Sequence, residues 1–129
     1  MAIEVKRKNR EIRDSGTITA VFKGKNVGET IDFMGIPEGF RIVDVNVTVD
    51  EAFSNTDNKI SIGIEGNYTR FVPQTTIDSV KGIGFNNRQL TAADSTAIVA
   101  DIVGSASEAG VVTVTVSYAK LPVAKQEYN

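Results

Sequence analysis

The side chains of this sequence that could do chemistry are mainly carboxylates, amides and amines, because the chain contains no His and no Cys. Their absence excludes Ser-His-Asp and Cys-His catalysis, general acid–base catalysis by His, and nearly all catalytic zinc sites. It also excludes disulfides and thiolate metal sites, although a domain of 129 residues does not need such links. The lack of Cys therefore does not indicate whether the protein occupies an oxidising or a reducing compartment.

The densest group of oxygen ligands lies in the segment from Asp50 to Asn58. It also includes Glu51, Asn55 and Asp57, and calcium prefers ligands of this kind. The spacing does not fit an EF-hand loop, whose glycine is missing here. Because Asn and Asp are equally typical of tight loops, we interpret the segment as a polar loop. We expect neither a metal nor any other cofactor.

Two carboxylates are enough for glycoside hydrolysis, and candidate residues occur on expected strands. Asp44 and Asn46 lie on the outer face of one strand, and Asp101 lies on another. The solvent face of a sheet commonly carries such residues, and no catalytic signature accompanies them. The Gly82-Ile83-Gly84 segment lacks the Lys and the following helix of a phosphate-binding loop. We therefore expect no enzymatic activity and no nucleotide binding.

β-Branched residues dominate the composition. The chain contains 16 Val, 13 Ile and 12 Thr, but only two Leu. Helical proteins depend on Leu and Ala, whereas pleated sheets favour β-branched side chains, so we expect an all-β protein. The length indicates a single domain. The chain becomes charged from Glu4 onward, and no apolar run is long enough to span a bilayer, so we expect neither a signal peptide nor a membrane partner.

Alternation of apolar and polar residues marks the expected strands. The clearest run places Val43, Val45, Val47 and Val49 on one face and polar residues on the other. Similar alternation occurs in residues 17–22, 29–34, 60–64, 98–102 and 111–119. Turn residues separate eight or nine such short segments, with no alternation of strands and helices. The pattern predicts an antiparallel β-sandwich, and eight strands fit a jelly roll.

One hairpin is predicted from its turn residues. Gly66-Asn67 follows the Ile60, Ile62 and Ile64 alternation and is typical of a hairpin turn. Pro73 lies in the returning segment, where its missing N–H is expected to end the strand or bend it.

A basic cluster lies near the start of the chain, at Lys6, Arg7, Lys8, Arg10 and Arg13. Residues 1–25 carry a net charge of +4, whereas the remainder carries −6. We divide the chain into an extended basic arm (1–14), a β-sandwich domain (15–120) and a C-terminal tail (121–129).

The arm is expected to contact an acidic partner surface, and a solvated terminus without a partner is the alternative. Nucleic acid is not expected as a partner. No aromatic residue lies among the basic ones to stack on bases, and the acidic remainder of the chain would repel phosphate.

Two apolar residues on the outward face of one expected strand suggest a contact between subunits. Val99 and Val103 lie opposite the inward face of Ile98, Ala100 and Ile102. They form a subunit contact if that outer face is buried by association. Alternatively, they belong to a central strand that is covered on both sides.

Three segments carry a resemblance to a known family. They are IPEGFRIVDVNVTVDEAF (36–53), ISIGIEGNYTRFV (60–72) and QLTAADSTAIVADIVGSASEAGVVTVTVSYA (89–119). Together they resemble the small decoration or cementing proteins of tailed-bacteriophage virions. The likeness covers roughly residues 30–119 and rests on turns and core strands, with no chemical signature. The basic arm is not part of it.

The resemblance implies a jelly-roll-like virion protein on the capsid exterior, present in many copies. Its partners would be the major capsid protein and other copies of itself, as a dimer or trimer. Binding would stabilise the expanded shell by mass action. The alternatives are a neck or tail-completion protein, or a receptor- or glycan-binding module of a tail or fibre. Against the glycan module, the chain has nine aromatic residues and no Trp.

Overall fold

The computed structural model describes residues 15–85 and 96–120, which form eight strands and one 3-10 turn. The elements are β1 (Ser15–Lys23), η2 (Gly24–Asn26), β2 (Thr30–Ile36), β3 (Phe40–Glu51), β4 (Lys59–Ile64), β5 (Asn67–Thr76), β6 (Lys81–Phe85), β7 (Thr96–Val103) and β8 (Val111–Lys120). Among these described residues, no helix has the length and apolar character needed to cross a bilayer. The proposed arm and tail lie outside the described residues.

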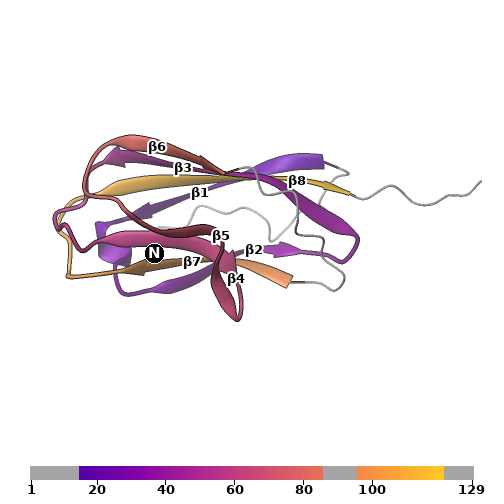
Figure 1. Cartoon of the computed structure of the whole chain (residues 1–129), viewed down its shortest axis with the longest axis horizontal. Coiled ribbons are helices and arrows are strands. Elements are labelled where there is room, and N and C mark those ends of the chain that lie inside the picture. Colours follow the sequence, from indigo (N-terminus) through magenta and orange to yellow (C-terminus); the bar gives the residue numbers. More distant parts are fainter. Residues whose placement is uncertain (1–14, 86–95, 121–129) are drawn as a thin grey trace, which may run out of the picture.

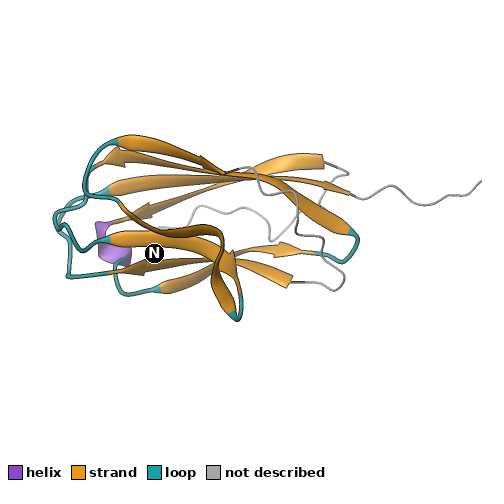
Figure 2. Cartoon of the chain, in the orientation of Figure 1, coloured by secondary structure: helices purple, strands orange, loops and turns teal. Residues whose placement is uncertain are grey.

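The strands form two four-stranded antiparallel sheets that pack face to face (Figures 1 and 2). We call the sheet with the order β1-β8-β3-β6 the upper sheet, and the sheet with the order β2-β7-β4-β5 the lower sheet. The first half of the chain pairs with the second half in reverse order, as β1–β8, β2–β7, β3–β6 and β4–β5. This pairing is that of one long hairpin rolled into a sandwich. It confirms the predicted β-sandwich and its jelly-roll form.

The core lies between the two sheets, because each strand turns one face inward. Phe22 of β1 and Phe33 of β2 meet across the sheets with their ring centroids 5.5 Å apart, edge to face. The remaining core side chains come from the other strands of both sheets and from Phe53 and Ile77 in the loops, and Ile83 of β6 packs against the layer. The largest fully buried ones also include Met34, Ile36, Ile42, Ile60, Ile62, Ile77, Ile98, Ile102, Val45 and Val47.

A β-bulge corrects one expectation about β3. The sequence pattern places Val43 in the core, but the register against β8 shifts between Ile42 and Asp44. Because a bulge reverses which side chains point inward, Ile42 is fully buried, whereas Val43 is only partly buried. Beyond the bulge the prediction is confirmed, since Val45, Val47 and Val49 are all fully buried.

The β4–β5 hairpin also departs from the expected register. Its turn is Glu65-Gly66 rather than Gly66-Asn67, and Gly66 has a φ of +88°. Pro73 lies within β5, an edge strand, close to a register shift, so it bends the strand instead of ending it.

The start of β5 crosses the outer face of β4. Ile62 pairs with Val72 and Ile64 with Asn67, so β5 has several extra residues between these two points. A Cβ atom on Gly63 would collide with the backbone of Asn67 and Tyr68. Only glycine therefore allows this approach, and the hairpin projects from the lower sheet (Figure 1).

Candidate binding surfaces

The outer face of the upper sheet is a ladder of short polar side chains. The Thr17 and Ser117 hydroxyls lie 3.4 Å apart, and the Thr19 and Thr115 hydroxyls 3.5 Å apart, across β1 and β8. The Thr113 hydroxyl donates to Asp50 at 2.6 Å. These hydroxyls lie within hydrogen-bonding distance of one another across the strands, as expected for a solvent-facing sheet.

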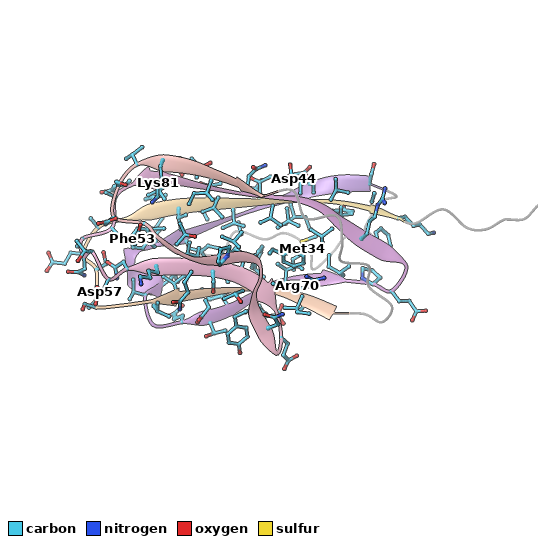
Figure 3. The ribbon with its side chains drawn as sticks, viewed as in Figure 1. Met34, Asp44, Phe53, Asp57, Arg70 and Lys81 are labelled. Carbon is cyan, nitrogen blue, oxygen red and sulfur yellow. The ribbon has the colours of Figure 1, made fainter. Side chains whose placement is uncertain are left out.

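The carboxylates on the strands do not converge. Asp44 lies on the upper sheet (Figure 3), where the Asn46 amide donates to it at 3.4 Å. Asp101 belongs to β7 of the lower sheet, where it accepts a hydrogen bond of 2.8 Å from the Thr30 hydroxyl. The two carboxylates thus face outward on opposite layers and cannot act on one bond. The described residues contain no group of three or more acidic side chains that could hold a metal ion.

The polar loop after β3 is tied to the loop after β7. Asn58 is completely buried, and its side-chain oxygen accepts from the backbone N–H of Asn55 at 3.0 Å. Its amide nitrogen donates to the carbonyl of Ser105 at 2.8 Å. The amide of Asn55 donates to the carbonyls of Ser105 and Ala106. The oxygen-rich side chains therefore bind backbone groups of the neighbouring loop.

Further hydrogen bonds complete this loop network. The backbone N–H of Ser54 donates to the Ser107 hydroxyl at 2.9 Å, and the Ser54 hydroxyl accepts from the N–H groups of Glu108 and Ala109. Gly104 has a φ of +115°, and a Cβ atom there would press on the backbone of Asp57. The loop contacts thus need glycine at this position.

The carboxyl group of Asp57 has a pKa below the usual range. Its carboxylate accepts a hydrogen bond from the Ser105 hydroxyl at 2.7 Å, and two from the Ser105 backbone N–H at 3.2 Å. The hydroxyl, followed by the N–H, holds the pKa of Asp57 below its ordinary value of 3.8. The residue lies at the loop end of the sandwich (Figure 3), fully open to solvent.

The two outward valines of β7 differ in their surroundings. Val99 stands outside the core cluster of Ile98, Ala100 and Ile102, so it faces the other side of the sheet, as the alternation predicts. It is nevertheless only 5% exposed, because the start of β5 covers this part of the lower sheet. Val103, at the end of β7, is partly exposed.

A shallow trough lies beside Val99 on the outer face of the lower sheet. We call it the Tyr68 trough. Its volume is about 160 Å³, and its lining residues are Thr30, Asp32, Glu65, Tyr68, Ala97 and Val99. β2 forms one wall and the projecting hairpin the other. Sequence reasoning missed this feature, because it depends on the extra residues of β5 that carry Tyr68 over β4.

A larger hollow of about 370 Å³ lies at the loop end of the sandwich. Lys23, Lys25, Glu51 and Glu108 contribute its charges, two of each sign. Balanced charges favour neither an anionic nor a cationic ligand.

The basic residues Lys6, Arg7, Lys8, Arg10 and Arg13 lie outside the described residues. The described residues carry eleven carboxylates and seven basic side chains, a net charge of −4. The described part of the sandwich is therefore acidic, as the charge of the sequence predicts.

No protein-family model and no curated protein matches this chain. Solved structures do match. A chain of the "Acidic stable capsid structure of Helicobacter pylori bacteriophage KHP30" matches with a TM-score of 0.69 and 20% identity, over 90% of this chain and 95% of that one. A chain of the "Cyanophage Pam1 capsid asymmetric unit" matches with a TM-score of 0.57 and 20% identity, over 84% of each chain.

A chain of the "Capsid of Ralstonia phage GP4" matches with a TM-score of 0.59 and 13% identity, over 84% of this chain and 86% of that one. At these identities the likeness shows a shared fold. It extends over nearly the whole sandwich.

We expect Asn58→Ala to lower the free energy of unfolding by about 1–3 kcal/mol, because the backbone N–H of Asn55 loses its acceptor and the carbonyl of Ser105 loses one of its two donors. Urea denaturation measures the loss. Asn46→Ala, on the exposed face of β3, is the matched control and should cost less than about 0.5 kcal/mol. Equal losses in the two variants would contradict the structural role of Asn58.

The lowered pKa of Asp57 predicts a stability that depends on acid. A carboxylate whose pKa is lower in the folded state stabilises the protein above the unfolded-state pKa, and this contribution is lost as the pH falls through the folded-state pKa. The loss should begin near the ordinary value of 3.8. Urea midpoints from about pH 6 to about pH 3 should therefore fall less in Asp57→Asn than in the wild type.

Glu38→Gln is the control for removing one exposed carboxylate from the chain. Parallel pH profiles for the wild type and Asp57→Asn would show that the Ser105 contacts do not favour the charged form.

Proposed function

We propose that this protein is a structural component of a tailed-phage virion that binds the outer surface of the capsid and stabilises the expanded shell. The observation that carries the proposal is the whole-domain likeness to chains of three phage capsid structures. Because each match covers 84% or more of both chains, the matched chains are about as short as this one. Such a size favours a small added component over a large shell-forming subunit.

The surfaces of the sandwich support a role that acts through contact area. The carboxylates of the outer strands do not converge, and the oxygen-rich loop is occupied by internal hydrogen bonds. A protein that binds only the expanded lattice stabilises that lattice by mass action. Many weak contacts on neighbouring subunits then add up through multivalency.

The basic arm is proposed as one contact with the capsid, through Lys6, Arg7, Lys8, Arg10 and Arg13. A basic segment next to an acidic sandwich favours an acidic partner surface. The extended arm would add main-chain pairing if it meets a free strand edge of the capsid.

Self-association as a dimer or trimer is the second part of the proposal. Val103 is the better placed of the two outward valines for such a contact, since it is partly exposed. Val99 would contribute less because its own chain covers it.

Copy number tests the proposal directly. Quantitative mass spectrometry of purified virions should give a molar ratio to the major capsid protein that approaches one or a simple fraction of it. A handful of copies per particle would instead assign the protein to the neck or tail, or to a receptor- or glycan-binding module. Absence from the virion would overturn the structural role.

Removing the charges of the arm should weaken capsid binding. A variant with glutamine at Lys6, Arg7, Lys8, Arg10 and Arg13 should bind expanded capsids at least about tenfold more weakly, since several exposed ion pairs of a few tenths of a kcal/mol each would be lost. Co-sedimentation with capsids at matched salt measures the change, and circular dichroism checks the fold.

A variant with glutamine at Arg41, Lys59 and Lys120 is the control, because it removes basic charges from the sandwich and leaves the arm intact. Unchanged capsid binding by the arm variant would refute the role of the arm.

A further inference from the structure

The Tyr68 trough has the size and lining of a site for one long side chain. Its volume of about 160 Å³ is below the range of about 300–1,000 Å³ that is usual for small-molecule sites. It is close to the roughly 150 Å³ cavity that holds a benzene molecule. A segment of protein that inserts a single side chain therefore fits the trough better than a free ligand.

The chemistry of the lining selects a cationic side chain. Ala97 and Val99 supply an apolar floor, and Asp32 and Glu65 place carboxylates on opposite walls. Tyr68, at 40% exposure, is one of the few large hydrophobic side chains that the described residues expose. Lys and Arg combine an aliphatic stem with a charged head, and they also bind to aromatic faces. Both features match this lining.

The chain itself contains a segment of this chemistry. Residues 6–13 carry Lys6, Arg7, Lys8, Arg10 and Arg13 against a single acidic residue, Glu11. We propose that the start of this basic segment docks in the Tyr68 trough of its own chain, with the Lys6 or Arg7 side chain between Asp32 and Glu65.

The geometry of the sandwich brings the arm to the correct edge. β1 is an edge strand of the upper sheet and β2 an edge strand of the lower sheet. The contact between Phe22 and Phe33 shows that these two edges lie one above the other. The arm precedes Ser15 at the start of β1, whereas Asp32 in the near wall of the trough lies next to Phe33, beside the end of β1.

The length of the arm is sufficient for this path. The path runs back along the seven residues from Ser15 to Phe22, about 23 Å at about 3.3 Å per residue, and crosses the spacing of about 10 Å between packed sheets. The nine residues from Lys6 to Ser15 reach about 30 Å when extended. The side chains of Lys6 and Arg7 can therefore reach the trough around the β1 and β2 edges, whereas Lys8, Arg10 and Arg13 are too close to Ser15.

Docking would give the arm an intramolecular contact that competes with the capsid. This consequence rests on the proposed function, whereas docking itself does not. Neutralising the trough would then release the arm and strengthen capsid binding, which is the opposite of neutralising the arm. The two ideas therefore predict changes of opposite sign.

Zero-length carbodiimide crosslinking of the full chain tests the docking. The reagent joins a lysine amine to a carboxylate that it contacts, and mass spectrometry identifies the joined peptides. We expect Lys6 to join Asp32 and Glu65 several-fold more often than Glu38 and Glu108, which are exposed carboxylates elsewhere on the sandwich. Equal yields at all four carboxylates would overturn the proposal, because they indicate an arm that samples the surface at random.

Two further measurements sharpen the result. In an equal mixture of unlabelled and nitrogen-15-labelled protein, crosslinks within one copy are expected, and crosslinks only between copies would overturn docking within the same chain. The preference for Asp32 and Glu65 should also disappear at about 1 M salt, where the Debye length is about 3 Å. A preference that persists there would exclude the electrostatic selection that we propose.

A variant with neutral residues in the trough distinguishes a failure of the docking proposal from a failure of the proposed function. The glutamine arm variant should shift the amide resonances of Ala97 and Val99 in the wild type, but not in a background with Asp32→Asn and Glu65→Gln, because the trough is already empty there. Each shift is measured against its own parent, since Asp32 pairs with Val99 and affects its resonance directly. A background with Glu38→Gln and Glu108→Gln is the matched control, in which the arm variant should still shift these resonances. If crosslinking succeeds but neither the wild type nor the trough variant binds capsids, docking stands and the proposed function fails.

Discussion

The apolar layer between the two sheets is the interaction on which every other feature depends. Each strand can bury only one face, and that face is occupied by aromatic and β-branched side chains such as Phe22, Phe33 and Val47. The ladders that hold this layer join distant parts of the chain, since Thr17 and Ser117 are separated by 100 positions. Neither half of the chain can bury its own apolar face. The outer surfaces and loops are therefore displayed by a framework that forms only as a whole.

Much of this framework could be predicted from the sequence, because the period of two that separates Val45 from Val47 reflects the pleat itself. The sandwich and its strands follow from that period. The inward face of Val43 does not, because the bulge beside Ile42 depends on the register against β8. Single-sequence alternation contains no information about a partner strand, and the same reason explains the shifted turn at Gly66.

The surfaces were harder to predict than the core. The oxygen-rich segment near Asn58 resembles a ligand site in sequence, yet its polar groups bind the backbone of a loop more than 40 positions away. The Tyr68 trough left no signal in the sequence, since it arises where β5 crosses Gly63. What the sequence did indicate was the separation of charge between arm and sandwich. Whether a polar or apolar side chain is available for binding depends on how the strands and loops pack around it, and a single sequence does not show that packing.

The position of β8 in the upper sheet has a consequence for how the protein is made. β8 is the last strand of the described residues, yet it lies between β1 and β3 and pairs with both. During translation β1 cannot form its ladder until residues 111–120 have been synthesised. Until then β3 exposes an unpaired edge to other nascent chains. The sandwich therefore closes only after residues 111–120 have been synthesised. A ribosome that stops before β8 would release a chain whose first and third strands have lost the neighbour that joins them.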